Sequence, residues 1–203
     1  MKPTGPGAPQ AIARNDRKQV VLTDARQMRA VAHPTRLALI GLLRRIGPLT
    51  ATEAGEQLGE SSGSMSFHLR QLAKYGLVEE TGEGTGRRKP WRATAQFTTW
   101  SATPDDPELG AATTQFSRLL AARYAAAVQA WIDRQADETD DWRTAAQFGD
   151  TVLWLTADEL AELGHKLTDL LRPYDDRLTD PDERPAGSRL VTWLHLSFPH
   201  EPS

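Results

Sequence analysis

The chain contains no cysteine among its 203 residues. Disulfides, thiolate metal ligands and a thiol redox switch are therefore excluded. It also lacks any apolar run approaching the roughly 18 residues that cross a membrane, and no signal-peptide pattern is visible. We therefore expect a cytoplasmic protein that makes no membrane contact.

Catalytic and cofactor motifs are missing as well. No glycine-rich phosphate loop follows an expected strand, and the five histidines do not combine with a nucleophile and an orienting group. The sequence thus predicts a protein that is not an enzyme and uses no cofactor. Glu162, His165 and Asp169 share one helix face at metal-ligand spacing, but three ligands leave a zinc site incomplete without a second subunit. We interpret them as a solvated helix face and predict no metal.

Acidic residues are scarce in the first half of the chain. Residues 1–100 carry 15 Lys and Arg against 8 Asp and Glu, whereas residues 101–203 carry 9 against 19. A basic half suits a polyanion, and an acidic half would repel one. Because 39% of the residues are hydrophobic and 25% are charged, the composition is that of a globular protein with one or two domains.

Two short helices joined by a polar turn are predicted between residues 50 and 73. Thr50 and Glu53 have the spacing of a capping box at the start of the first helix. Gly59 provides a left-handed helix stop, and Ser61 can cap the second helix. About three residues then separate the helices, which is the spacing of a helix-turn-helix.

The second helix of this motif has one apolar and one polar face. Met65, Leu69 and Leu72 recur at i, i+4 and i+7, so they must face a core. Small hydroxylic residues in the first turn, followed by an arginine, suit a helix whose amino end enters a major groove. The predicted DNA-binding residues of this helix are Ser62, Gly63, Ser64, Ser66, Phe67 and Arg70. An ordinary helical hairpin shows the same capping and periodicity, so the flanking sequence has to decide.

A strand, a glycine-rich turn and a second strand follow over residues 76–94. Alternate glycines at 82, 84 and 86 allow positive φ in a hairpin loop. Beside a helix-turn-helix such a hairpin would be a wing, with cations placed to contact DNA phosphates. An alternative is a solvated charge cluster that protects a sheet edge. The cations in question are Arg87, Arg88 and Lys89.

Three segments together carry a family resemblance: HPTRLALIGLL at 33–43, MSFHLRQL at 65–72 and GLV at 76–78. With them, residues 24–95 resemble the winged-helix repressors of the ArsR type. The resemblance implies a homodimer whose recognition helix reads the major groove, with base contacts from Ser62, Ser64, Ser66 and Phe67. Gly63 departs from the family pattern, since glycine in a helix costs about 0.5–1 kcal/mol relative to alanine and offers no base contact.

The amino-terminal segment divides into an arm and the start of the DNA-binding domain. Residues 1–19 are rich in Pro and Gly and lack periodicity, so we predict a disordered arm that either frays or enters a minor groove. The winged helix-turn-helix domain is predicted to span residues 20–95. A helix should begin after Asp24, and a second at Pro34 with His33 as its cap.

A Thr- and Ser-containing linker then leads to a long helix, predicted over residues 107–134. Apolar residues keep a three-and-four spacing along it, and alanines keep it slim enough for close helix approach. A lone winged helix could not cover this stripe. The family resemblance points to a dimer seam here, and a core helix packing within its own chain is the alternative. The predicted dimerisation residues are Leu109, Phe116, Leu120, Tyr124 and Trp131.

The remainder of a dimerisation and effector domain, 105–200, is predicted as strand, helix and strand. After an acidic loop at 135–149, residues 150–155 have the pattern of a strand, Thr156 and Glu159 form a second capping box, and the helix should end near Leu171. A polar loop and a closing strand at 189–199 follow. The strand pairing, parallel or antiparallel, stays open.

Aromatic residues of the carboxyl half have two interpretations. They could line a pocket for a small organic effector, or they could serve core and dimer packing without any ligand. The residues concerned are Phe116, Tyr124, Trp131, Trp142, Trp154 and Trp193.

Taken together, the sequence predicts a mainly α (α+β) protein with a winged helix-turn-helix domain, a long dimerisation helix and a small strand-helix-strand module. The function predicted is a transcriptional regulator, more specifically a repressor, that binds double-stranded palindromic DNA as a homodimer. The alternative is a winged-helix module that binds a protein partner without sequence-specific DNA binding. These two differ in salt dependence, because only the first neutralises phosphates.

Overall fold

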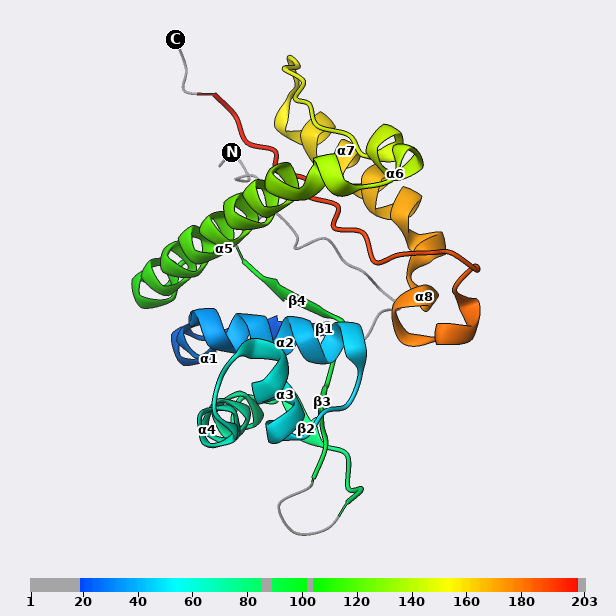
Figure 1. The fold of residues 1–203 in the computed structure, drawn as a ribbon. Coiled ribbons are helices and arrows are strands. Elements are labelled where there is room, and N and C mark those ends of the chain that lie inside the picture. Colours follow the sequence, from blue (N-terminus) through cyan, green and yellow to red (C-terminus); the bar gives the residue numbers. More distant parts are fainter. Residues whose placement is uncertain (1–18, 85–88, 102–103, 201–203) are drawn as a thin grey trace, which may run out of the picture. The chain divides into compact units, whose positions relative to one another are not determined.

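The computed structural model describes residues 19–84, 89–101 and 104–200, which are mainly helical (Figure 1). The chain forms two compact units, Met1–Leu120 and Ala121–Ser203. The predicted fold class, a mainly helical α+β protein with a winged helix-turn-helix, is confirmed. The predicted arm at 1–19 lies outside the described residues except for Gln19.

Four helices and a hairpin make up most of the N-terminal unit. The helices are α1 (Ala25–Val31), α2 (Pro34–Ile46), α3 (Ala51–Leu58) and α4 (Ser62–Ala73). The predicted start signals are confirmed: Asp24 caps α1, His33 caps α2 with Pro34 in its first turn, and Thr50 forms a capping box with Glu53. Figure 1 shows α2 lying across α3 and α4.

The core of this unit is built where these helices meet. Met65, Leu69 and Leu72 of α4 are fully buried, as their periodicity predicts. Met28 of α1 and Leu39 of α2 are buried with them in one cluster. This cluster fixes α4 against its neighbours and so determines which of its sides faces solvent.

The wing hairpin follows α4. Strands β2 (Val78–Glu80) and β3 (Trp91–Ala93) are antiparallel, with Val78 opposite Ala93 and Glu80 opposite Trp91. Leu49, just before α3, pairs with Trp91 through two backbone hydrogen bonds. The hairpin is thereby tied to the start of the helix-turn-helix.

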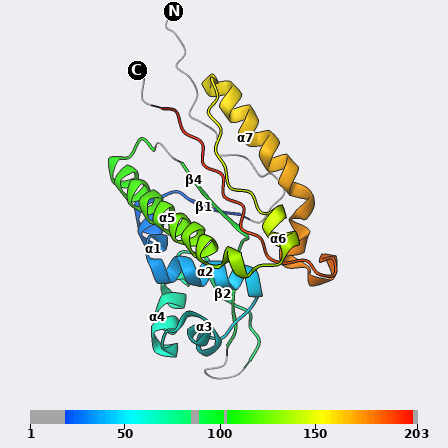
Figure 2. The same ribbon diagram turned by 45° about the horizontal axis from the view of Figure 1, so that its top comes forward.

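A parallel strand pair was not predicted from the sequence. β1 (Gln19–Leu22) pairs with β4 (Phe97–Trp100), so Gln19 belongs to a strand rather than to the arm, and the expected linker contains a strand (Figure 2). Arg44 of α2 anchors β4 by donating to the Ala95 carbonyl at 2.9 Å and to Thr98 Oγ1 at 2.7 Å. These strands have only four residues each and lie far apart in the sequence, so they show no local periodicity from which they could be predicted.

The long helix α5 (Pro107–Arg134) has the predicted bounds. The division between the two units falls within it, after Leu120. In its first half, Ala112 and Phe116 are buried in the core of the N-terminal unit, and the Phe116 ring packs edge-on against Trp100 at 4.9 Å. Phe116 therefore stabilises its own chain.

The C-terminal unit contains the rest of α5 and several shorter helices. α7 (Ala157–Leu171) opens with the predicted capping box of Thr156 and Glu159 and ends where expected. Residues expected to be loops instead form brief helical turns. These are η1 (Gln135–Asp137), α6 (Asp140–Ala145), η2 (Arg172–Tyr174), α8 (Asp176–Thr179) and η3 (Pro181–Glu183).

The prediction of strands at 150–155 and 189–199 is wrong. Both segments are extended, but neither belongs to a strand pair within the described residues, and Figure 2 draws them without arrows. Their apolar side chains, among them Val152, Trp154, Val191 and Phe198, are exposed. A strand needs a neighbour to accept its backbone hydrogen bonds, and alternating apolar residues alone do not supply one.

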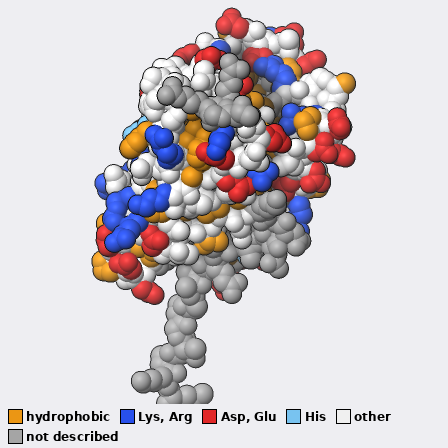
Figure 3. Space-filling view, turned by 90° about the horizontal axis from the view of Figure 1, so that it is seen from below, with side chains coloured by type: hydrophobic (Ala, Val, Ile, Leu, Met, Phe, Trp, Pro, Cys, Tyr) orange, Lys and Arg blue, Asp and Glu red, His pale blue; other side chains and the backbone are white. Residues whose placement is uncertain are grey.

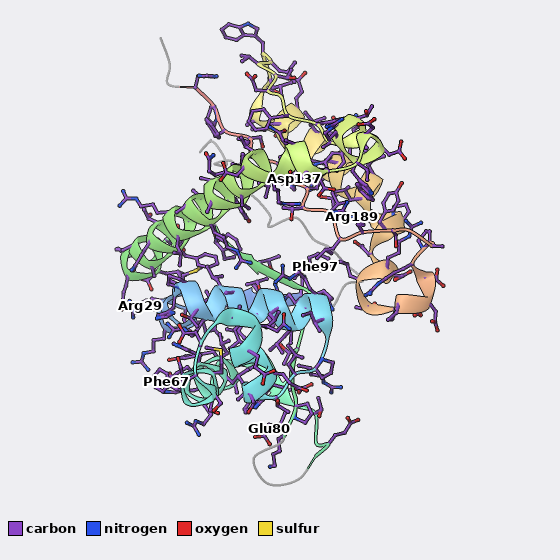
Figure 4. All side chains as sticks on the ribbon, viewed as in Figure 1. Arg29, Phe67, Glu80, Phe97, Asp137 and Arg189 are labelled. Carbon is purple, nitrogen blue, oxygen red and sulfur yellow. The ribbon has the colours of Figure 1, made fainter. Side chains whose placement is uncertain are left out.

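A bidentate ion pair fixes the start of the closing segment. Arg189 donates to both carboxylate oxygens of Glu138 at 2.7 and 2.9 Å, and its guanidinium stacks on Trp142 at 4.8 Å. Arg134 donates to the same carboxylate at 3.0 Å. These hydrogen bonds hold the pKa of Glu138 below its usual value. Figure 4 labels Arg189 and the neighbouring Asp137.

Candidate nucleic-acid interface

The outer side of α4 is the predicted DNA-reading surface. Ser62, Gly63, Phe67 and Arg70 are exposed there, while Ser64 and Ser66 are half-buried. Phe67 exposes 51% of its surface and packs edge-on against His68 at 5.3 Å (Figure 4). The structure therefore places all six predicted residues outside the core.

The amino end of α4 is held by its cap. The Ser61 hydroxyl accepts from the Ser64 amide at 3.1 Å, and Gly59 ends α3 in the left-handed region at φ 68°. The first-turn amides of α4 and its positive dipole end are thus set on a fixed turn, which favours an anionic group nearby.

Gly55 determines how closely the turn packs on α3, and the sequence analysis missed it. Its carbonyl accepts from the Glu60 amide at 2.9 Å. A Cβ added at Gly55 would lie 2.5 Å from the Glu60 carbonyl oxygen, which is too close for any side chain. Helix periodicity does not indicate that glycine is needed at this position, because the steric clash is with the turn that follows α3.

The wing cations are only partly described. Arg87 and Arg88 lie outside the described residues. Lys89 pairs with Glu80 at 3.0 Å, and Arg92 pairs with Glu79 at 2.8 Å across the hairpin. All four side chains are about half exposed, so these pairs are weak and can yield to a phosphate.

A set of basic residues on α1 and α2 adjoins α4 and was not predicted as part of the site. Arg26, Arg29 and Arg36 line an open hollow of about 240 Å³ together with Gln71 and Tyr75. Arg29 pairs with Glu108 at 2.7 Å, and Arg36 donates to the carbonyls of Ala30 and Arg29 at the end of α1.

Figure 3 shows Lys and Arg side chains at several places on the face seen from below, with Asp and Glu side chains among them. The contact between α1 and α4 is tertiary, which is why the sequence pattern did not reveal it.

Two histidines meet behind the reading face. The His33 and His68 rings lie 4.8 Å apart, and His33 Nδ1 accepts from the Thr35 amide at 3.2 Å. His68 Nδ1 is buried and has no hydrogen-bond partner among the residues that the structure describes. Burial lowers the pKa of both rings; Arg36 lowers them further, and Glu60 opposes the change. The surroundings of both rings therefore favour the neutral form, and the rings pack against each other between α2 and α4.

The predicted dimerisation residues fall into two groups. Leu109, Phe116 and Leu120 pack on the core of the N-terminal unit. Tyr124 and Trp131 are half-buried in the C-terminal unit, where Arg134 stacks on the Trp131 ring at 5.0 Å. Only the second group lies beyond the N-terminal core.

Among the described residues, no group of three or more metal-ligating side chains is positioned to hold a metal ion. Glu162 pairs with Lys166 at 2.7 Å and Asp169 with Arg172 at 2.5 Å, so two of the three candidate metal ligands on α7 are engaged with cations. Trp154 and Trp193 are exposed, whereas Phe116 is buried in the other unit. Within the described part of the chain, no helix is long and apolar enough to cross a membrane.

Residues 31–81 match the helix-turn-helix domain family. The match covers α2, α3, α4 and β2, which are the elements that build and orient the reading face. The comparison with curated proteins gave no match.

Solved structures similar to this chain include regulators. One is a MarR family regulator from Neisseria meningitidis, with 18% identity, a TM-score of 0.30, and coverage of 72% of this chain and 79% of that one. Another is apo MarR from E. coli, with 16% identity, a TM-score of 0.29, and coverage of 73% and 87%. A protein from Mycobacterium tuberculosis has 13% identity, a TM-score of 0.30, and coverage of 79% and 86%.

Proposed function

We propose that this protein is a transcriptional regulator that binds double-stranded DNA as a homodimer and acts as a repressor by occupying its operator. The observation that carries the proposal is the outer face of α4, where a capped amino end, Ser62, Phe67 and Arg70 stand clear of a closed core. A helix in this setting can enter a major groove with its amino end foremost.

The surrounding cations support this orientation. Lys74 lies near the carboxyl end of α4, and the hollow lined by Arg26, Arg29 and Arg36 flanks the same helix. Cations beside a recognition helix contact phosphates and set its register, while α4 itself reads bases. In a dimer, two such helices would lie about 34 Å apart, in successive major grooves of a palindromic site.

Several finer features belong to the proposal. The ArsR-type resemblance over residues 24–95 favours a repressor with a wing that contacts phosphates through Arg87, Arg88 and Lys89. The protein would act in the cytoplasm without catalysis or cofactor. A small organic effector could act on the carboxyl half, because the absence of cysteine removes soft metal ligands and redox switching.

Sequencing of DNA retained by the purified protein tests the proposal. A recovered palindrome with half-sites one helical turn apart is the expected result. The affinity for that site should fall steeply as salt rises. Protein binding releases counterions from the phosphates, and this release becomes less favourable at higher salt. Recovery of no enriched sequence, together with salt-independent binding, would exclude operator recognition.

A protein-binding module is the second candidate, and Phe67 is the observation that favours it. A half-exposed phenylalanine in the middle of the face could anchor a protein groove as well as stack against DNA. Comparing Arg70→Ala with Phe67→Ala separates the two. For DNA, the arginine substitution should weaken binding and relax the sequence preference. For a protein partner, the phenylalanine substitution should dominate, and binding should depend little on salt.

A further inference from the structure

The C-terminal unit has almost no interior of its own. Of its described residues only Thr168 is buried. The hydrophobic core cluster of the chain, together with the partly buried residues packed against it, draws all its members from residues up to Leu120. A unit of this length that buries no large apolar side chain lacks the main favourable term of folding.

Most of the exposed large apolar residues of this unit lie in two extended segments. The first is 150–155 with the preceding Phe148, and the second is 189–199. Between them they expose Phe148, Val152, Leu153, Trp154, Leu155, Leu190, Val191, Trp193, Leu196 and Phe198. Neither 151–155 nor 190–199 contains a Lys, Arg, Asp or Glu.

Both segments also have backbone N–H and C=O groups that take part in no strand pair among the described residues. The strand pairs found in the described residues are β1 with β4 and β2 with β3, so no ladder uses 150–155 or 189–199. Extended, uncharged segments with free N–H and C=O groups are templates for pairing with another strand.

The rest of the described chain offers no second set of extended, unpaired apolar segments. The other exposed large hydrophobic residues of the C-terminal unit are Ile132, Leu163, Leu170 and Tyr174, which lie on helices or helical turns. In the described part of the N-terminal unit, the exposed large hydrophobic residues are Val21, Ile46 and Phe67, which are isolated on three different elements. DNA is an unsuitable occupant because the segments lack cations and the surrounding unit is acidic. A second C-terminal unit offers the same amount of unpaired apolar strand.

The available area is sufficient for a stable dimer. Phe148, Trp154, Trp193 and Phe198 are 81%, 101%, 58% and 74% exposed. At about 200 Å² per aromatic side chain, these four would cover about 600 Å². The six aliphatic residues bring the surface to the roughly 800 Å² per partner of a standard protein interface.

We propose that residues 148–155 and 189–199 form an interface with a second copy of this chain, in which the extended segments pair as strands and the two units share one core. The inference rests on the proposed function in one respect: it takes the proposed homodimer as given and names the surface that holds it together. It assigns dimerisation to these segments, in place of the Phe116 and Leu120 seam predicted from the sequence.

Sedimentation velocity of the full-length protein without DNA tests this interface. Trp154→Ser should raise the dimer dissociation constant by at least about tenfold, because each copy loses a large buried apolar side chain. Leu196→Ser, in the other segment, should do the same. Trp154 is fully exposed in a single chain, so its replacement removes no contact from the monomer. Ile46→Ser is the control, because it also removes an exposed large apolar residue, outside both segments, and should leave the dissociation constant unchanged.

Tryptophan fluorescence gives a second readout that does not depend on a variant. The wild-type emission should shift to the blue as the dimer forms with rising protein concentration. A monomer at all concentrations, or a Trp154→Ser variant that dimerises like wild type, would overturn the proposal. Blue emission from a protein that sediments as a monomer would place the missing core within one chain, and binding of the monomer to anionic lipid vesicles would assign the surface to a membrane; either result overturns the proposal. None of these measurements involves DNA, so a failure of the proposed DNA binding would be recognised separately from a failure of the proposed interface.

Discussion

At the scale of single residues, two glycines of the helix-turn-helix have opposite roles. Gly55 is buried with its Cα facing the Glu60 carbonyl, whereas Gly63 is exposed, and an added Cβ would meet only the Ser61 hydroxyl, at 3.8 Å. Both occupy helices, so helix propensity alone treats them alike. The two positions differ in which atoms of the turn between α3 and α4 lie next to the glycine Cα.

Gly55→Ala and Gly63→Ala should therefore change stability in opposite directions. The first forces the turn away from α3 and should cost about 1–3 kcal/mol of unfolding free energy. The second stiffens the unfolded chain and should add about 0.4–1 kcal/mol. Urea denaturation of the two variants checks this. Equal effects of the two substitutions would show that the turn does not pack as described.

The His33 and His68 pair should make stability depend on pH. Because the pKa of each ring is lower in the folded chain, the unfolded chain binds more protons than the folded chain as the pH falls. The free energy of unfolding should then fall as pH drops below about 6.5, the ordinary pKa of histidine, and the loss should be complete below the folded pKa values.

Urea denaturation between pH 7.5 and 5.5 measures that loss. His68→Met removes one titrating group and should flatten the dependence. His165→Met is the control, since His165 is exposed on α7. An unchanged pH profile in His68→Met would show that the pair is not responsible.

At the scale of elements, local signals decided what the sequence could predict. The bounds of α5 and α7 followed from caps and three-and-four periodicity, which are properties of neighbouring residues. β1 and β4 were missed because each has four residues and a partner far along the chain. The strands expected at 150–155 and 189–199 had the right pattern but no partner strand in the described part of their own chain.

The candidate site shows the same division. The exposure of Ser62, Phe67 and Arg70 could be predicted because their spacing opposes that of the buried face of α4. The hollow beside α4 could not, since it depends on α1 packing against that helix. Its arginines were visible only as part of a basic amino half.

Arg44 should control the attachment of the β1–β4 pair. Its guanidinium is largely buried, and burial lowers its pKa to about 10, so it remains charged at neutral pH. Arg44→Met would leave the Ala95 carbonyl and the Thr98 hydroxyl without their donor, at a cost of about 1–3 kcal/mol. Hydrogen exchange at Val20–Leu22 and Thr98–Trp100 should accelerate.

Arg45→Met provides the comparison for Arg44. Arg45 is the next residue of α2 and is exposed. Its replacement should leave exchange in β1 and β4 unchanged. Similar acceleration in both variants would trace the effect to the charge of α2 rather than to the anchor.

At the scale of the whole molecule, the chain separates two kinds of interaction. Its amino half is basic and contains the closed core and the reading face, and its carboxyl half is acidic and exposes uncharged apolar segments. Salt should therefore affect the two associations differently. DNA binding weakens as phosphates regain their counterions, while an interface formed by uncharged side chains should respond little.

If dimerisation aligns two recognition helices on a palindrome, the two kinds of binding are thermodynamically linked. A palindromic site should raise the apparent dimer affinity, and dimerisation should raise the affinity for the palindrome by the same factor. Trp154→Ser should then lose affinity for a full palindrome while keeping wild-type affinity for a single half-site. Fluorescence anisotropy with both DNAs measures this difference. Arg70→Ala, by contrast, should weaken binding to both DNAs, because it removes a contact that every half-site uses. A Trp154→Ser variant that weakened on both DNAs equally would show that the carboxyl segments act on the reading face itself rather than through the dimer.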